Sequence, residues 1–498
     1  MSAMRDALRR LSTESLIYGL GQVSGRAVQV LLVPVLTRVL ARSAFGVSEL
    51  VFAYLQTAVL VLVFGMDGAL ARFFYHEPDR AARIRMASTS LAFRLATGVA
   101  AAAVLALCAA PLARQLVGGE VYRKYVLIGA VTLPFTLVVL FGNDVLRVTF
   151  QPWKFIVLNF TQTVLTAGLS LWLVLVRHLG VAGVLYGRLA GDAACALLAL
   201  VLVRHTIRPR FQWTTLRRML AYGAPLVPVA IAYGAIASLD SYVLQRSRGL
   251  VDVAVYRVAM KFFALVTMAI SAFQLAYGPF AFAHARAPDA GRLYARVLAG
   301  YVAIASFVAL LVGLFAPEVL AIAVPRGYAA AAGPAALLAF AAVAQGAYYI
   351  CSVGIGLALK TPLQGWTAGG AALVAVVANL LLGPRLGPFG AGLATTLAYM
   401  TSAVLTYLIA QRVHPAPFRG ARLALVFLFA LALTLVGQHL PFAIRLAGRS
   451  IDLPGGAPVK IALALVFAAL AWRLRLLEER GAVAPSATAR VTGAAPTG

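Results

Sequence analysis

The sequence predicts an all-α membrane protein with about fourteen transmembrane helices, on the basis of three observations. Of its 498 residues, 62% are hydrophobic and only 12% are charged, which is about half the charged fraction of a soluble protein. The mean hydropathy is +0.89. Apolar runs of about 20 residues, the length that a helix needs to cross the hydrocarbon core, recur from end to end. A β-barrel would instead show alternating segments of about 10 residues.

Fourteen such runs follow one another along the chain, separated by short polar, proline- or glycine-containing stretches. No connecting loop is longer than about twenty residues, so we expect no soluble domain on either side of the membrane. The first run is too long for a cleavable signal peptide. The expected spans are 15–37, 44–66, 87–111, 125–146, 155–176, 181–203, 219–244, 254–283, 294–316, 334–358, 365–383, 389–411, 421–440 and 459–476.

The net charge of +27 is divided unevenly between the two sides of these spans. With the N-terminus inside, 25 Lys and Arg lie on inner loops, tails and adjoining helix ends, and 13 lie on outer ones. The inner loop 204–218 alone holds five arginines. The positive-inside rule therefore predicts that both termini are cytoplasmic. The basic residues are not grouped with aromatics as on a nucleic-acid surface, so we expect anionic membrane lipid and no nucleic acid as their partner.

An internal repeat divides the chain, as in many transporters. Residues 179–190 align with 386–398 at an offset of 207, and residues 43–54 align with 250–261 at nearly the same offset. Spans one to six would then match spans seven to twelve in parallel orientation, forming two pseudo-symmetric six-helix lobes with a cavity between them. The expected parts are a cytoplasmic N-terminus (1–14), a first lobe (15–205), a second lobe (206–412), two C-terminal helices (413–477) and a disordered cytoplasmic tail (478–498).

Short motifs recur at the helix ends of both lobes. They are Leu36-Thr37-Arg38 and Phe45-Gly46 around the first turn, Asp240 late in span seven, Tyr256 at the start of span eight, and the glycine pairs Gly180/Gly183 and Gly387/Gly390 that begin spans six and twelve. Over about residues 12–475 the chain therefore resembles the polysaccharide-type flippases of the MOP superfamily. That group includes the Wzx-type flippases of O-antigen synthesis and the lipid II flippase of peptidoglycan synthesis.

The resemblance implies a non-enzymatic protein of the bacterial inner membrane that works by alternating access. Its cargo would be an undecaprenyl-pyrophosphate-linked oligosaccharide, moved from the cytoplasmic to the periplasmic leaflet for O-antigen, capsule or exopolysaccharide synthesis. A polysaccharide polymerase and a chain-length regulator would be its protein partners. The sequence has no nucleotide-binding motif, so we expect no cofactor. Energy would come from an H⁺ or Na⁺ gradient, the membrane potential or consumption of the cargo.

Five cations lie within the spans and are the candidate cargo-binding residues: Arg26, Arg94, Arg188, Arg257 and Lys261. A charge at membrane depth costs roughly 3 kcal/mol on insertion scales, so it is usually functional or paired. Arginine suits a pyrophosphate because it is always charged and can bind phosphate in a bidentate manner. Arg26 could instead pack beside Gly21 and Gly25. Arg257 could extend to the surface, since it lies near the start of its helix.

Three carboxylates within the spans are the candidate coupling or gating residues: Asp192, Asp240 and Glu49. Asp192 lies one turn after Arg188, so the two form either a structural ion pair or a coupling site. Gly183, Gly187 and Gly191 mark a close helix contact beside them. Asp240 would bind a coupling cation, act in a gate, or pair with Arg38 or Lys261. Pro225 and Pro228 would bend span seven, as a static kink or as a lateral gate for the lipid tail.

Other functions remain as alternatives to the oligosaccharide flippase. A lipid II flippase fits nearly as well, and a multidrug or cation antiporter of the same superfamily would have twelve spans and a less cationic interior. A membrane glycosyltransferase would need carboxylates on large outer loops, and a scaffold would not retain buried charges. The cysteines, Cys108, Cys195 and Cys351, have no metal-binding spacing, so we expect no metal site.

Overall fold

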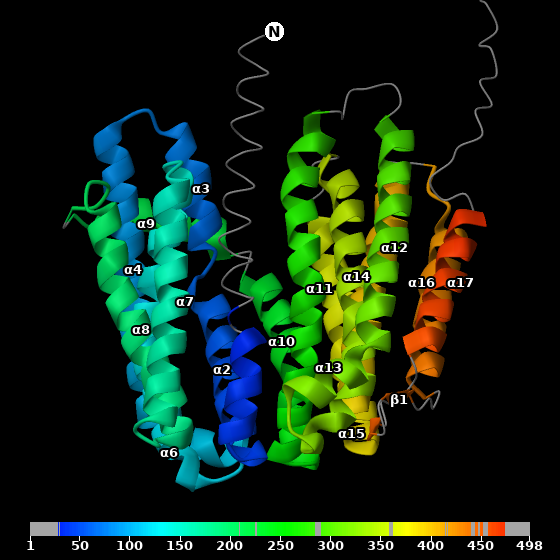
Figure 1. Cartoon of the computed structure of the whole chain (residues 1–498). Helices are drawn as coiled ribbons and strands as arrows, with labels where there is room; N and C mark the ends of the chain where they lie inside the picture. Colours follow the sequence, from blue (N-terminus) through cyan, green and yellow to red (C-terminus); the bar gives the residue numbers. More distant parts are fainter. Residues whose placement is uncertain are drawn as a thin grey trace, which may run out of the picture.

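A computed structural model describes residues 28–473, except position 29 and the gaps at 209, 225–226, 284–289, 358–361, 414, 416, 440–443, 447–448 and 452–456. Within these residues the protein is helical apart from one short hairpin, and the predicted fold class is confirmed. Figure 1 shows the two lobes side by side, with α16 and α17 on the outer flank of the second lobe. The predicted tail and N-terminus lie outside the described residues.

The helices follow the chain order that the apolar runs predict. The first lobe contains the helix Val30–Val39, α2 (Arg42–Leu62), α3 (Met66–His76), α4 (Arg80–Leu107), α5 (Ala109–Leu112), η1 (Ala113–Val117), η2 (Glu120–Tyr122), α6 (Arg123–Val148), α7 (Pro152–Leu175), α8 (Gly180–Val203) and α9 (Trp213–Gly223). The second lobe contains α10 (Val227–Ser247), α11 (Leu250–Ala283), α12 (Ala290–Leu314), α13 (Ala316–Ala323), η4 (Arg326–Ala331), α14 (Ala332–Leu357) and α15 (Pro362–Val413). After it come α16 (Gly420–His439), the hairpin β1 (Ile444–Leu446) and β2 (Arg449–Ile451), and α17 (Ala457–Arg473).

Each predicted span overlaps a described helix, the first of them only from residue 30 onward. Ten helices of the described part are long and apolar enough to cross a membrane, and one of them, α15, covers the predicted spans eleven and twelve. The first, seventh and fourteenth spans correspond to Val30–Val39, α10 and α17.

The two lobes share an unusual turn where the repeat aligns them. Gly180 and Gly387, which the repeat places over each other, have φ values of +55° and +58°. This left-handed region is readily populated by glycine and costly for most other residues. At Gly387 the turn separates α15 into two helices. The same backbone device therefore begins the sixth helix of each lobe.

The lobes contact each other through α2, which packs against α10 and α11. A Cβ on Gly46 of α2 would lie 2.2 Å from the Leu250 carbonyl oxygen, so only glycine allows this approach. Beside it, the Arg38 side chain donates to the Ile322 carbonyl at 2.7 Å and Arg42 donates to the Gly327 carbonyl at 3.1 Å. These contacts join the lobes at the end of the bundle where α2 begins.

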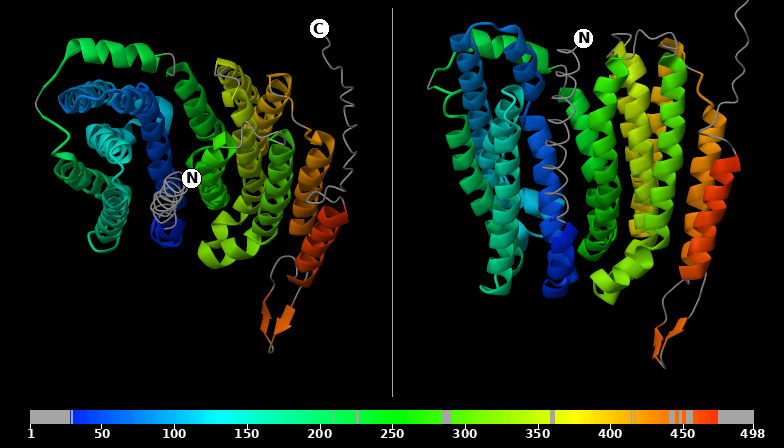
Figure 2. Two further views of the ribbon diagram at one scale, coloured as in Figure 1. Left: turned by 90° about the horizontal axis from the view of Figure 1, so that it is seen from above. Right: turned by 45° about the horizontal axis from the view of Figure 1, so that its top comes forward.

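The predicted bend in span seven is wrong. The structure ends α9 at Gly223 and begins a separate helix, α10, at Val227, while Pro225 lies outside the described residues. Proline removes a backbone donor and disfavours helical geometry in the residue before it, so a helix readily ends here. In the view from above, α9 is seen lengthwise along the edge of the first lobe, beside α3 and α4 (Figure 2).

The predicted close contact in the first lobe is present between α7 and α8. A Cβ on Gly187 would lie 2.4 Å from the backbone nitrogen and Cα of Ser170, and one on Gly191 would lie 2.9 Å from the backbone of Thr166. A Cβ on Gly183 would lie 3.1 Å from the carbonyl carbon of Leu173. The absence of side chains on this face of α8 brings Arg188 and Asp192 close to α7.

We expect Gly187→Ala to destabilise the protein by about 1–3 kcal/mol, because the added methyl group meets backbone that cannot move aside. Gly168→Ala is the matched control, since a Cβ there has no atom within 4 Å. Thermal unfolding of the purified variants would measure the difference. Equal stability of the two variants would contradict the close packing of α7 on α8.

Candidate functional site

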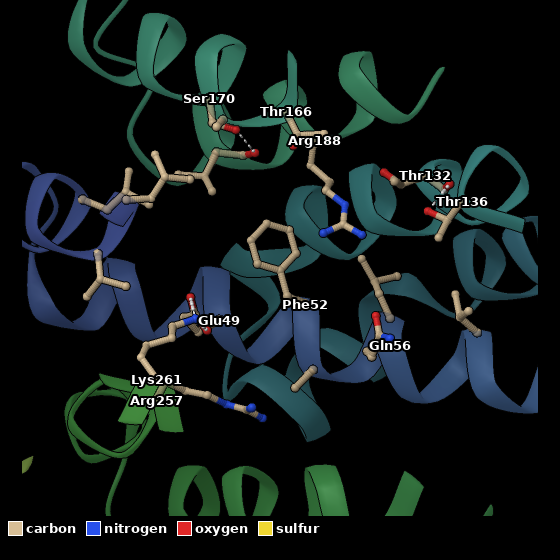
Figure 3. Close-up of a pocket in the computed structure, with 18 of the residues that line it drawn as sticks. Glu49, Phe52, Gln56, Thr132, Thr136, Thr166, Ser170, Arg188, Arg257 and Lys261 are labelled. Carbon is tan, nitrogen blue, oxygen red and sulfur yellow. Dashed lines mark hydrogen bonds and ion pairs between the residues drawn. The ribbon is translucent and has the colours of Figure 1, made fainter. Parts of the chain in front are cut away.

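A cavity of about 390 Å³ lies in the first lobe and extends to α11 of the second lobe (Figure 3). Residues of Val30–Val39, α2, α6, α7 and α8 form most of its wall. Three cations and one carboxylate line it, so its described charges sum to +2. Its polar lining residues are Glu49, Gln56, Thr132, Thr136, Thr166, Ser170, Arg188, Arg257 and Lys261.

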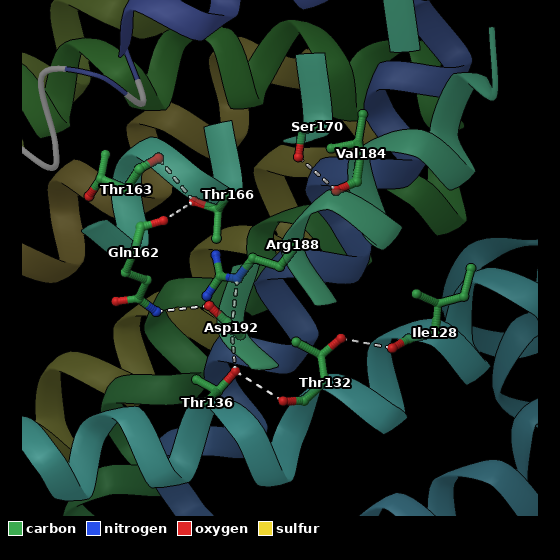
Figure 4. A network of polar contacts seen from close by, with 10 residues as sticks. All are labelled: Ile128, Thr132, Thr136, Gln162, Thr163, Thr166, Ser170, Val184, Arg188 and Asp192. Carbon is green, nitrogen blue, oxygen red and sulfur yellow. Dashed lines mark hydrogen bonds and ion pairs between the residues drawn. The ribbon is translucent and has the colours of Figure 1, made fainter. Parts of the chain in front are cut away.

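Arg188 extends into this cavity from α8 and is held at its base by Asp192. The Arg188 Nε lies 3.1 Å from Asp192 Oδ2, and the Asp192 carboxylate is fully buried. Thr136 donates to the same oxygen at 2.7 Å, and Gln162 donates to Oδ1 at 2.8 Å (Figure 4). The predicted ion pair is thus present. Asp192 thus accepts from three side chains, and the far end of the Arg188 guanidinium points into the cavity beside Phe52 (Figure 3).

Lys261 and Glu49 form a second ion pair across the boundary between the lobes. Lys261 Nζ, on α11, lies 2.9 and 3.0 Å from the two carboxylate oxygens of Glu49, on α2. Both side chains are partly buried. Arg257 and Lys261, the two cations one turn apart on α11, therefore differ in their surroundings. Lys261 has a carboxylate in contact, whereas no ion pair is described for Arg257.

Arg257 is the cation of this cavity whose guanidinium is least satisfied. Its residue is only 9% exposed, and its Nε and Nη2 atoms are buried without a hydrogen-bond partner among the described residues. It lines the cavity rather than extending to the surface. A buried N–H group without a partner costs about 1–3 kcal/mol. The Arg257 guanidinium therefore has hydrogen-bonding capacity that the described residues do not use.

Asp240 belongs to a separate polar cluster in the second lobe and does not line the cavity. It is fully buried on α10 and accepts hydrogen bonds from the Ser241 N–H at 2.5 Å and from the Tyr256 hydroxyl. The Tyr256 hydroxyl also lies 3.1 Å from that of Thr395. The expected pairing with Arg38 or Lys261 is wrong, because those cations bond to the Ile322 carbonyl and to Glu49.

Arg94 does not line the cavity either. It is fully buried on α4, where its Nη2 lies 2.6 Å from Asp144 Oδ2 of α6. Arg147 lies 3.3 Å from the other oxygen of Asp144. This geometry makes Arg94 part of an ion pair that joins α4 to α6. Arg26 lies outside the described residues.

Most of the neutral polar wall was missed from the sequence, although a signal for it exists. Gln162, Thr166 and Ser170 follow one another at four-residue spacing in an apolar span. Thr132 and Thr136 do the same in another span. This spacing places polar groups on one face of a helix. Polar residues at four-residue spacing within an apolar span are therefore a second sequence signal for the cavity, besides the charged residues.

The sequence and the structure were each compared with known proteins, and both comparisons find membrane proteins of polysaccharide synthesis or transport. A family model described as "Polysaccharide biosynthesis protein" matches residues 12–280. No curated protein matches the sequence. Among solved structures, the lipid II flippase MurJ in an inward closed conformation superimposes with a TM-score of 0.71 at 12% identity, covering 92% of this chain and 98% of that one.

Two MATE transporters have the same fold. An inward-facing MATE family transporter of the MOP superfamily has a TM-score of 0.64 at 16% identity, with 80% of this chain and 95% of that one covered. The Vibrio cholerae MATE transporter VcmN, in its bent form, has a TM-score of 0.56 at 12% identity, with 83% and 97% covered.

We expect Asp144→Asn to lower stability by about 3–5 kcal/mol, because it leaves the buried charge of Arg94 without a carboxylate. Removing both charges, in Arg94→Met with Asp144→Leu, should restore much of the loss. Asp79→Asn is a control at an exposed carboxylate, where the Ala81 N–H lowers the pKa of Asp79 and asparagine caps the helix equally well. Thermal unfolding tests the series; a harmless Asp144→Asn would refute the structural pair.

Proposed function

The chain belongs to the polysaccharide biosynthesis protein family of the MOP superfamily, and we propose that it is a flippase for polyprenyl-pyrophosphate-linked oligosaccharides. It is a multi-pass membrane protein. In this proposal it works in the bacterial inner membrane with both termini in the cytoplasm, and carries undecaprenyl-pyrophosphate-linked repeat units to the periplasmic leaflet. It performs no chemical reaction on the cargo.

The observation that carries the proposal is Arg257, which has no hydrogen-bond partner for its Nε and Nη2 among the described residues, in a cavity that Arg188 and Lys261 also line. A pyrophosphate offers several charged oxygens that can accept from these guanidinium and ammonium groups. Such bonds would offset the cost of burying Arg257. A cavity with surplus positive charge would also repel cationic drugs, which disfavours the multidrug exporter.

The neutral wall of the cavity suits the sugars that follow the pyrophosphate. The hydroxyls of Thr132, Thr166 and Ser170 donate to the carbonyls of Ile128, Gln162 and Val184. The hydroxyl protons are therefore already used in hydrogen bonds, and the hydroxyl oxygens remain able to accept. Sugar hydroxyls can donate to such oxygens. The lipid tail would remain in the bilayer while the polar head occupies the cavity.

Coupling to an ion gradient, in this proposal, acts through the carboxylates. Glu49 competes with the anionic cargo for Lys261, so cargo binding releases the Glu49 carboxylate, which becomes free to bind the coupling cation. Asp240, buried among hydroxyl groups in the second lobe, is the candidate for a coupling H⁺ or Na⁺. Asp192 instead acts by holding Arg188.

Alternating access would require the lobes to separate where Arg38, Arg42 and Gly46 now join them. With the predicted orientation, this junction is at the periplasmic end. Cargo would enter from the cytoplasmic end and leave after these contacts break. A polysaccharide polymerase would then consume it, with a chain-length regulator acting on the product.

A lipid II flippase is the second candidate, favoured by the superposition on MurJ over 92% of this chain. Both cargoes carry a polyprenyl pyrophosphate, so the cationic groups of the cavity suit either one. The lipid that accumulates when the gene is lost distinguishes them.

The test of the function is to delete the gene, extract the polyprenyl-linked lipids and identify what accumulates. We expect an undecaprenyl-pyrophosphate oligosaccharide to accumulate while surface polysaccharide is lost. Accumulation of lipid II would identify the second candidate. No accumulation, together with altered drug or cation sensitivity, would refute both flippase assignments and favour the exporter.

Complementation of that strain tests the cavity cations. We expect Arg257→Gln to reduce surface polysaccharide at least tenfold at normal protein abundance, because it removes charged hydrogen bonds worth about 1.5–3 kcal/mol. Arg188→Gln should reduce it as well, and because it leaves the buried Asp192 carboxylate without its cation, its protein abundance should also fall. Arg123→Gln, at an exposed helix start, is the matched control. Full activity of Arg257→Gln would exclude it from cargo binding.

Glu49→Gln tests the competition for Lys261. We expect the purified variant to bind the pyrophosphate lipid about fivefold more tightly, since a partly exposed ion pair worth about 1 kcal/mol no longer has to be broken. Its transport should also lose dependence on the ion gradient. Weaker binding would show instead that Glu49 positions Lys261 for the cargo.

A further inference from the structure

The segment that connects the two lobes carries an exposed basic surface with no assigned role. Residues 204–223 contain five arginines and no aspartate or glutamate. We call this segment, comprising the loop 204–212 and α9, the basic linker. It runs from the end of α8 to the start of α10, so it is the only covalent connection between the lobes.

The linker is held against the first lobe by its backbone and its apolar residues. The Arg208 N–H donates to Ser88 Oγ at 2.9 Å, and the Gln212 N–H donates to Thr89 Oγ1 at 3.2 Å, both on α4. Leu216 and Met219 of α9 are buried. The attachment therefore leaves the charged side chains to face outward.

Those outward residues combine cations with aromatic rings. Arg208, Arg210 and Arg217 are exposed and form no ion pair within the described part of the chain. Phe211 and Trp213 beside them are 56% and 64% exposed. An arginine-rich amphipathic helix with exposed aromatics is typical of helices that lie in the membrane interface.

The position of α9 agrees with that composition. It is seen lengthwise in the view from above, along the edge of the first lobe beside α3 and α4 (Figure 2). The linker follows the last residue of α8 and bonds to Ser88 and Thr89 of α4, close to where the predicted apolar span 87–111 begins. The exposed arginines and rings are thus at the depth where lipid headgroups lie.

We propose that the basic linker binds the headgroups of anionic phospholipids, with Arg208, Arg210 and Arg217 as the phosphate-binding residues. Phe211 and Trp213 insert at the level of the headgroups. Arginine matches a phosphate because its planar guanidinium donates two parallel hydrogen bonds. The proposal does not depend on the nature of the cargo, since these residues lie outside the cavity.

Binding here has a consequence for the movement of the lobes. A linker held in the headgroup layer fixes the end of the first lobe relative to the membrane plane. The second lobe, joined to it through 225–226, is then the part that tilts. Membranes poor in anionic lipid should therefore weaken the attachment without removing the cavity.

The test is native mass spectrometry of the purified full-length protein in an equimolar mixture of phosphatidylglycerol and phosphatidylcholine. The variant Arg208→Gln/Arg210→Gln/Arg217→Gln removes three cations from the linker. The matched control, Arg123→Gln/Lys124→Gln/Arg177→Gln, removes three cations from the opposite end of the same lobe. The number of bound lipids of each kind is counted.

Each arginine near an anionic surface contributes about fivefold to binding, so we expect the linker variant to lose its preference for phosphatidylglycerol by at least tenfold. The control should retain it. An unchanged preference in the linker variant, or an equal loss in the control, would overturn the proposal; in the first case an acidic protein would be the better occupant.

Discussion

The guanidinium of Arg257 is the point on which the account of this protein depends. Other charges described within the spans are compensated: Arg94 by Asp144, Arg188 by Asp192, and Lys261 by Glu49. Arg257 has no carboxylate within ion-pair distance among the described residues, although Asp240 interacts with it electrostatically. It lies beside the cavity, and in the proposed function an anionic cargo would bind it.

The cavity around Arg257 is formed by close backbone contacts that only glycine permits. Gly187 and Gly191 bring α8 against α7, which places Arg188 and its partner Asp192 among the polar groups of the first lobe. Gly46 brings α2 against α11, and that contact sets Glu49 opposite Lys261. The cavity therefore has walls from both lobes, and a change in how the lobes meet would alter its charge as well as its shape.

The sequence predicted the helices well and the pairings less well. Apolar length is a local property, so each predicted span overlaps a described helix, and the repeat aligned Gly180 with Gly387, two of the five glycines with left-handed backbone among the described residues. The Arg188–Asp192 pair was also predictable because both residues lie on one helix. Partners on different helices were not: Glu49 and Lys261 are 212 residues apart. The expected partners of Asp240 were wrong for the same reason, and the end of α9 was hidden within a continuous apolar run.

The most direct measurement of the central claim is the affinity of the purified protein for a polyprenyl pyrophosphate and for the matching polyprenyl monophosphate. If Arg257 binds the pyrophosphate, the wild type will prefer the pyrophosphate, and Arg257→Gln will lose at least tenfold of that preference while keeping its stability. If both lipids bind equally well to the two proteins, the Arg257 guanidinium does not serve the cargo, and the proposed role of the cavity is wrong.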